Sequence, residues 1–152
     1  TTAISAAPYI NNGYRDYLSR IRSSVPAQSR TLANINCGYA FEQGRVLDYR
    51  NLEFLNGSGL KFEEYIDTRG IEYIVYPQEM DFIYENRPVW NILYGNLYPY
   101  YADMKRFLSE RCLKVNEFHS PYAMRIAGMM YGRDWSVEVY SVQREEKNEY
   151  SF

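Results

Sequence analysis

Few side chains in this chain of 152 residues could do chemistry. It has one histidine, His119, and two cysteines, Cys37 and Cys112. A Ser-His-Asp or Cys-His site needs its histidine beside an activated nucleophile, and the sequence has no Gly-x-Ser-x-Gly turn. We expect His119 to lie at a strand end and to hydrogen-bond its own loop. A hydrolase that uses Cys37 or Asp48 with His119 is kept as a third hypothesis.

Phosphate and metal sites have equally little support. The nearest approach to a glycine-rich phosphate loop is residues 56–59, but no strand comes directly before it, so we expect a flexible connector. Cys37 and Cys112 are too few and too far apart for a zinc site. We therefore predict no metal and no cofactor. Two free thiols are expected, and a single disulfide remains an alternative if the domain is extracytoplasmic.

Polar residues follow each of the first three predicted strands. Since the carboxyl ends of parallel strands meet at one edge of a sheet, where ligands usually bind, these residues form the candidate ligand-binding site. They are Asn36 and Tyr39 after the first strand, Asp48 and Arg50 at the second, and Gln78 after the third. Asp48 and Arg50 are either a binding pair or a loop tether in which the carboxylate accepts backbone N–H groups, and we favour the tether.

The predicted elements are organised around residues 60–77. Residues 71–77 are mostly β-branched or aromatic and end at a proline, which indicates a strand in the middle of a sheet. The preceding run, residues 60–69, places Phe62, Tyr65 and Ile66 on one helical face, and Gly70 follows at the position of a helix C-cap. This is half of a β-α-β unit.

Further patterns extend this unit into an α/β fold. Helices are predicted at residues 14–25, 39–43, 78–85 and 102–111, and strands at 31–36, 45–49, 113–119, 123–127 and 135–142. The last of these is predicted as an edge or terminal strand, and residues 86–99 as irregular. We predict a three-layer α-β-α sandwich with a mostly parallel sheet and antiparallel strands at the C-terminal end. Residues 1–12 are predicted as a leader or linker, 13–142 as a single α/β domain, and 143–152 as a charged tail.

The composition of the chain limits the classes of molecule that it is expected to bind. The net charge is -2 without a basic block, so nucleic acid is not expected. The chain has 17 tyrosines, which build either an aromatic core and rim or a surface that meets sugars, lipid head groups or a protein. The same alternatives apply to Trp90, Tyr94, Tyr98 and Tyr100, which either pack over the sheet edge or face a sugar or the bilayer interface.

Three segments in order carry a family resemblance: residues 32–39 (LANINCGY), 44–52 (GRVLDYRNL) and 64–77 (EYIDTRGIEYIVYP). The pattern resembles the C-terminal soluble, extracytoplasmic domain of polytopic membrane glycosyltransferases of the GT-C type, relatives of the protein mannosyltransferases and the lipid-A aminoarabinose transferase. The match covers about residues 14–80, with weaker similarity to Tyr140.

This resemblance implies a noncatalytic accessory domain of a membrane-embedded glycosyltransferase that uses a lipid-linked sugar donor. The family's catalytic carboxylates are expected between membrane helices, and this chain has no run of about 18 apolar residues, so no catalytic residue is carried over. The implied location is the extracytoplasmic face of the cell membrane. The implied partners are the transmembrane part of the parent, the membrane surface, and a glycan or lipid-linked sugar. We also expect a chain that starts at Thr1 to be a piece of a longer protein.

A stand-alone binding domain is the alternative. It would have a flavodoxin-like fold and take a nucleotide or a sugar at the edge formed by Asn36, Tyr39, Asp48 and Arg50.

Overall fold

The computed structural model describes residues 15–34, 45–86, 88–120 and 135–144. Several predicted features lie outside these residues: the leader at 1–12, the helical patch at 39–43, the strand at 123–127, and all but the first two residues of the tail at 143–152.

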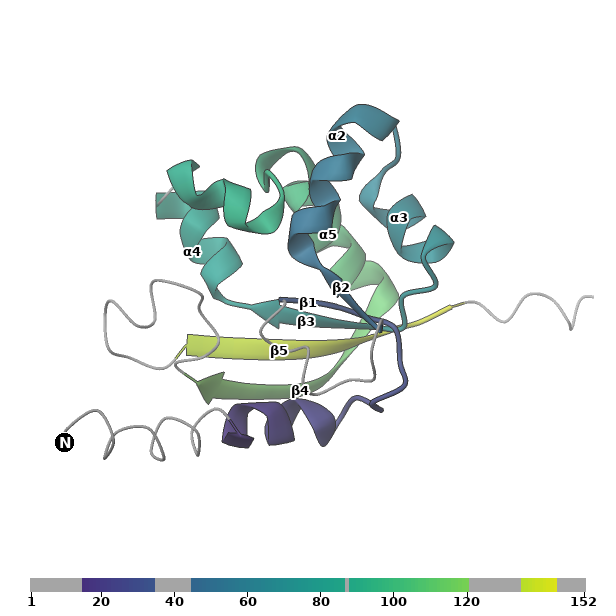
Figure 1. Ribbon diagram of the computed structural model, residues 1–152, viewed down its shortest axis with the longest axis vertical. Helices are drawn as coiled ribbons and strands as arrows, with labels where there is room; N and C mark the ends of the chain where they lie inside the picture. The colour runs from purple at the N-terminus through teal and green to yellow at the C-terminus, as the bar shows by residue number, and fades with distance from the viewer. Residues whose placement is uncertain (1–14, 35–44, 87, 121–134, 145–152) are drawn as a thin grey trace, which may run out of the picture.

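The fold is α/β, with a five-stranded mixed sheet and helices packed against it (Figure 1). The strands are β1 (Thr31–Ala33), β2 (Val46–Asp48), β3 (Tyr73–Pro77), β4 (Cys112–Ser120) and β5 (Trp135–Val142). Their order across the sheet is β2-β1-β3-β5-β4. β1 is parallel to both β2 and β3, whereas β5 is antiparallel to β3 and to β4. The first three strands therefore form a parallel half, and a C-terminal hairpin-like pair completes the sheet.

The helices lie on both sides of this sheet. The α-helices are α2 (Leu55–Ser58), α3 (Phe62–Thr68), α4 (Glu79–Asn86) and α5 (Tyr98–Arg111), and the 3-10 helices are η2 (Tyr49–Phe54) and η3 (Pro88–Tyr94). α2 to α5 lie on one side of the sheet, and the helix of residues 15–22, drawn in purple, lies on the other (Figure 1).

The predicted unit of helix, glycine and central strand is confirmed. α3 buries Phe62, Tyr65 and Ile66, and burial of such a side chain contributes about 1.5–3 kcal/mol. The helix ends in a Schellman motif, because Ile71 N–H donates to the carbonyl of Ile66 at 3.1 Å and Gly70 N–H donates to that of Asp67 at 3.3 Å. Gly70 has φ +64°, a left-handed conformation that favours glycine. The chain then enters β3, the middle strand of the five.

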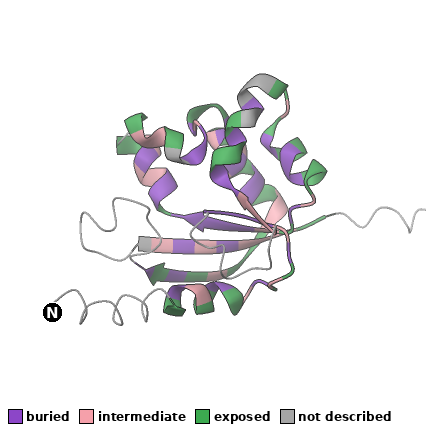
Figure 2. Cartoon of the chain, viewed as in Figure 1, coloured by how far each residue is buried: buried purple, intermediate pink, exposed green. Residues whose placement is uncertain are grey.

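Two apolar clusters hold the helices to the sheet. Figure 2 colours the buried residues of the helices and the strands purple. Successive side chains of a strand point to opposite faces, so Ile74 packs with α3 and α5, whereas Val75 packs with the helix of residues 15–22. Tyr17, Ile21 and Val25 supply the apolar face of that N-terminal segment, as their helical spacing predicts.

The position of β5 corrects the sequence interpretation. Residues 135–142 were expected to form an edge or terminal strand. β5 is the last strand along the described chain, but the edge position is wrong, because β5 lies between β3 and β4, and β4 is the edge. The physical reason is burial: Val137 and Val139 are fully buried in one cluster with Tyr17, Ile21 and Val25, and both sides of β5 are hydrogen-bonded. The alternating pattern came from the two faces of the strand and carried no information on its neighbours.

The segment predicted to be irregular is partly helical. Residues 88–94 form η3, and α5 begins at Tyr98, four residues before the predicted start at 102. Pro99 lies in the first turn of α5, where its missing N–H costs no helical hydrogen bond. Among the described residues, no helix is both long enough and apolar enough to cross a bilayer.

Candidate functional site

The carboxyl ends of β1, β2 and β3 bring several polar residues to one edge of the sheet. Asn34 follows β1, Asp48 is the last residue of β2, and Gln78 and Glu79 follow β3. This is the edge at which the sequence placed the candidate site. Two of the five candidates, Asn36 and Tyr39, lie outside the described residues.

Asp48 and Arg50 are engaged with each other. Asp48 is the N-cap of η2: its Oδ1 accepts a hydrogen bond from the backbone N–H of Arg50 at 3.0 Å. The Arg50 Nε lies 3.6 Å from Asp48 Oδ2. Asp48 is buried and Arg50 is exposed. These contacts are those of a loop tether, in which the carboxylate orders the chain that leaves β2.

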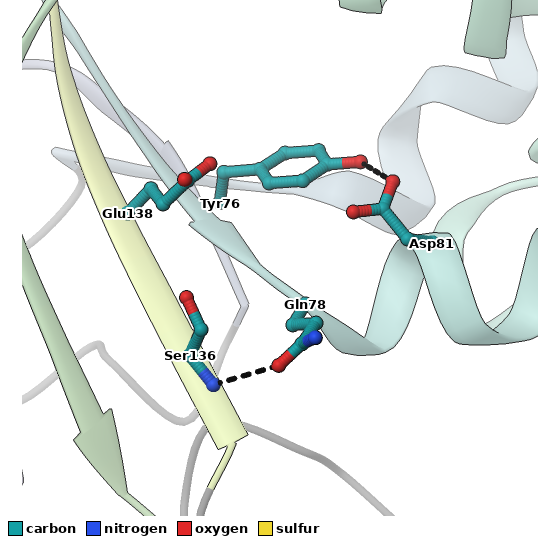
Figure 3. A pocket seen from close by; sticks show the side chains of 5 residues that line it. All are labelled: Tyr76, Gln78, Asp81, Ser136 and Glu138. Atoms are coloured by element: carbon teal, nitrogen blue, oxygen red, sulfur yellow. Dashed lines mark hydrogen bonds between the residues drawn. The ribbon is translucent and has the colours of Figure 1, made fainter.

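Gln78 lines a polar pocket, and it is the only lining residue that was predicted from the sequence as a candidate. The pocket has a volume of about 110 Å³ and is lined by Tyr76, Gln78, Asp81, Ser136 and Glu138 (Figure 3). It forms because Tyr76 of β3 pairs directly with Glu138 of β5, while α4 starts just after β3 and places Asp81 beside the Tyr76 hydroxyl. Gln78 closes one end: the backbone N–H of Ser136 donates to its Oε1 at 3.0 Å, and its own N–H donates to the Ser136 carbonyl at 2.8 Å.

Asp81 is the centre of a hydrogen-bond network on the helix side of the pocket. Its Oδ1 accepts from the hydroxyls of Tyr76 at 2.6 Å and Tyr101 at 2.5 Å, and the Lys105 ammonium lies 3.3 Å away. Burial, and then the Asp81 carboxylate, raise the pKa of both tyrosines above the usual value, most strongly for Tyr76. Both hydroxyls therefore remain protonated donors at neutral pH.

Lys105 strengthens this arrangement from α5. Its Nζ lies 4.6 Å from the centre of the Tyr76 ring and 3.4 Å from the Tyr76 hydroxyl. Tyr84 stacks on Tyr101 with ring centres 3.8 Å apart. The pocket wall is thus held by one carboxylate, one ammonium and a group of aromatic rings.

Glu138 has its own partners on the strand side. Its Oε1 accepts from the Tyr140 hydroxyl at 2.8 Å, and Lys114 of the edge strand β4 lies 3.3 Å from its Oε2. Lys114 also contacts Glu117 at 2.7 Å, and this hydrogen bond lowers the pKa of the exposed Glu117 carboxyl. Residues 136, 138 and 140 share one face of β5, because side chains two apart on a strand point the same way.

A second polar group is buried beside this pocket. The Asn34 amide donates to the Tyr94 hydroxyl at 3.2 Å, and that hydroxyl donates to Oε1 of Glu79 at 2.5 Å. Glu79 and Tyr94 are fully buried, and Asn34 is nearly so. Burial, followed by the Glu79 carboxylate, raises the pKa of Tyr94 well above its usual value. Oδ1 of Asn34 is buried without a hydrogen-bond partner among the described residues. This network joins the ends of β1 and β3 through η3.

A larger cavity lies elsewhere, between α3 and α5. It has a volume of about 200 Å³ and is lined by Phe107 and six charged residues: Lys61, Glu63, Asp103, Arg106, Glu110 and Arg111. Its arginines are already paired with carboxylates: Arg106 with Asp103 at 2.9 Å, and Arg111 with Glu63 at 3.0 Å. The Arg111 pair connects the two helices.

The hydrolase hypothesis pairs His119 with either Cys37 or Asp48, and the structure excludes the pair with Asp48. Asp48 ends β2 and His119 lies on β4, and these strands are the opposite edges of the sheet. With about 4.8 Å between neighbouring strands, the two residues are separated by roughly 19 Å, far beyond a hydrogen bond. His119 is exposed, and Cys37 lies outside the described residues. Cys112 is a free thiol, and burial raises its pKa to about 12, so it is a poor nucleophile at neutral pH.

The aromatic residues of the 86–101 segment divide between core and surface. Tyr94 and Tyr100 are buried, and the Tyr100 hydroxyl donates to the carbonyl of Tyr94. Trp90 is half-buried against the core, and Tyr98 is exposed. The alternative that these rings face a sugar or the bilayer interface is therefore wrong for Tyr94 and Tyr100.

Sequence reasoning named Gln78 as a candidate, but it did not name Tyr76, Asp81, Ser136 or Glu138, which line the same pocket. The predicted helix at 78–85 placed Asp81 just after the third strand, which was a usable local signal. The contribution of Glu138 had no local signal, because it depends on pairing between residues 62 positions apart in the chain.

Across the described ranges, no group of three or more His, Cys, Asp or Glu side chains is arranged to hold a metal ion. Neither a protein-family model, nor a curated protein, nor a solved structure matches the chain.

Proposed function

We propose that this chain is a noncatalytic accessory domain of a membrane-embedded glycosyltransferase, positioned at the extracytoplasmic face of the cell membrane. The order of the three segments at residues 32–39, 44–52 and 64–77 supports the proposal, since they resemble that family. The parent would transfer a sugar from a lipid-linked donor, with the reactive carboxylates in its membrane part. We further propose that the fold is a three-layer α-β-α sandwich, with the helix of residues 15–22 as the third layer.

An exposed apolar ridge on η3 is the observation that carries this proposal. Val89 is 78% exposed and Ile92 is 65% exposed. Residues three apart in a 3-10 helix lie on the same side, so the two side chains form one ridge. Large exposed apolar side chains that are adjacent mark contact surfaces more often than isolated ones do. In the proposed assembly this ridge contacts the bilayer interface beside the membrane-embedded part.

Two measurements test the proposal. First, the reading frame that contains these codons should encode several apolar spans upstream of Thr1, and a start codon directly before Thr1 would refute the assignment. Second, the purified chain should float with liposomes of anionic and zwitterionic lipid. Replacing Val89 and Ile92 by Ser should weaken the partition about tenfold or more, because each buried aliphatic side chain contributes about 1.5–3 kcal/mol.

A matched control distinguishes binding through this ridge from nonspecific adsorption through any exposed apolar side chain. Leu113 and Val115 are also exposed, at 58% and 40%, but lie on the edge strand β4. The Leu113→Ser/Val115→Ser chain should float like the unmodified chain. If this control loses as much binding as the ridge variant does, the ridge is not the contact.

A second candidate function is that of a stand-alone small-molecule binding domain. The observation that favours it is the polar pocket at the end of β3, which opens at the edge where parallel α/β sheets hold their ligands. A rise in melting temperature with nucleotides, flavins or sugars would support this function, and no shift with any of them would count against it.

A further inference from the structure

The pocket lined by Tyr76, Gln78, Asp81, Ser136 and Glu138 has unused hydrogen-bonding capacity of both kinds. All the hydrogen bonds and the ion pair of the Asp81 carboxylate within the described part of the chain go to Oδ1. Its second oxygen, Oδ2, is turned toward the strand that carries Glu138 (Figure 3). Asp81 Oδ2 is thus an available acceptor on the pocket wall.

Donors line the same pocket. Gln78 uses its side-chain oxygen to accept from the Ser136 N–H, and its amide nitrogen makes no hydrogen bond to other described residues. The Ser136 hydroxyl is likewise available to donate and to accept, as judged over the same residues. A small pocket therefore offers a carboxylate acceptor, amide donors and a hydroxyl.

The charge balance of the pocket selects against anions. Asp81 is neutralised by Lys105, and Glu138 shares Lys114 with Glu117. Three carboxylates and two ammonium groups leave no excess of positive charge for a phosphate, and both ammonium groups already contact carboxylates. A neutral ligand avoids the cost of bringing a further charge into a partly buried site.

The walls are also held in place before a ligand arrives. Tyr76 is 1% exposed, its hydroxyl is bound to Asp81, and its strand position is paired with Glu138. Pre-organised polar groups lose little conformational entropy when they bind, which favours recognition by hydrogen bonds. Hydroxyl groups both donate and accept, so neighbouring hydroxyls match a wall that mixes acceptors and donors.

We propose that this pocket binds a neutral polyhydroxylated molecule, a sugar or a polyol, through Asp81 Oδ2, the Gln78 amide and the Ser136 hydroxyl. The inference deepens the second candidate function and rests on it, but it does not depend on a membrane location. In the setting of a glycosyltransferase, the same site would hold a hydroxyl-rich part of the donor or the acceptor.

Nuclear magnetic resonance of the ¹⁵N-labelled chain tests the proposal directly. The probes are D-glucose, D-mannose, N-acetylglucosamine and myo-inositol, each titrated to high millimolar concentration. We expect at least one of them to shift the Gln78 side-chain amide and the Ser136 backbone amide signals in a saturable way. The osmolyte betaine, which has no hydroxyl group, should leave both signals in place.

Substitutions then assign the binding to the pocket. In Asp81→Asn one oxygen remains to accept from Tyr76 and Tyr101, but the second becomes a donor, so affinity should fall at least tenfold. The matched control is Asp16→Asn, an exposed carboxylate on the helix across the sheet, and it should bind normally. If Asp81→Asn does not fold, Ser136→Ala removes one hydroxyl with little effect on the backbone and should also weaken binding.

The other outcomes refute the binding of a polyol, this pocket as its site, or the small-molecule binding function itself. No saturable shift with any sugar or polyol refutes the inference. Binding that Asp81→Asn and Ser136→Ala leave unchanged refutes this pocket as the site. If uridine monophosphate shifts these signals and the neutral probes do not, the polyol inference fails while the small-molecule binding function survives. If no small molecule of any class binds, both fail.

Discussion

Gly95 is the residue at which the end of η3 meets η2, and its substitution gives a sharp test of the fold around the buried Tyr94. It has φ +66°. A Cβ atom at this position would lie 2.7 Å from the carbonyl oxygen of Arg50, 2.7 Å from the backbone N of Glu53 and 2.9 Å from the carbonyl oxygen of Tyr49. All three are backbone atoms of the same 3-10 helix, η2, so they cannot move away independently.

The expected cost of Gly95→Ala has two parts. The left-handed backbone costs an L-residue about 1–2 kcal/mol, which is partly offset by about 0.4–1 kcal/mol because alanine has less entropy to lose from the unfolded state. Overpacking against rigid neighbours adds about 1–3 kcal/mol. The free energy of unfolding should therefore fall by about 1–4.6 kcal/mol, and the melting temperature by roughly 2–18 °C for a chain of this size.

Gly59→Ala is the matched control, since Gly59 has φ +77° but a Cβ atom added there would meet no described atom within 4 Å. The change in the free energy of unfolding of this variant reflects only the cost of the left-handed backbone, without the steric overlap. Urea and thermal unfolding of both variants, followed by circular dichroism, measure the difference. If Gly95→Ala is no less stable than Gly59→Ala to within about 0.5 kcal/mol, the close contact between η3 and η2 is refuted.

Three further predictions concern buried groups. Tyr94→Phe removes the hydroxyl that donates to the buried Glu79, and urea unfolding should show a loss of about 1–3 kcal/mol; an unchanged midpoint would contradict the network. Burial raises the pKa of Tyr94 and Tyr76, so their contribution to stability is complete below about pH 10, where free tyrosine titrates, and is lost as pH rises further. The part of the tyrosinate absorbance that comes from Tyr94 and Tyr76 should then appear only together with unfolding. Ionisation of all tyrosines in a still-folded chain would refute the burial of these two. In a Cys37→Ser chain, Cys112 should react with iodoacetamide at pH 8 much more slowly than a free thiol does, because burial raises its pKa to about 12; equal rates would show an accessible thiolate.

The extent to which the sequence predicted the site follows from the range of the interactions. Gln78 was named as a candidate because it comes directly after a recognisable strand, and Asp48 was predicted to be a tether from its type and its position before a turn. The pocket itself was not predicted, because Glu138 and Ser136 reach it only through the pairing of β5 with β3. Sequence periodicity reports which face of a strand is buried, and it does not report which strand lies alongside.

By itself, the amino-acid sequence determined the local units: the apolar face of α3, its termination at Gly70 and the buried β3. Each depends on the spacing of side chains or on a backbone angle that neighbouring residues set. Only the tertiary structure decided that β5 enters the sheet between β3 and β4, that Tyr94 is buried against Glu79, and that Asp81 shares a pocket with Glu138. These features depend on contacts between separate elements of the fold, which form when burial of apolar surface selects one arrangement of the whole sheet.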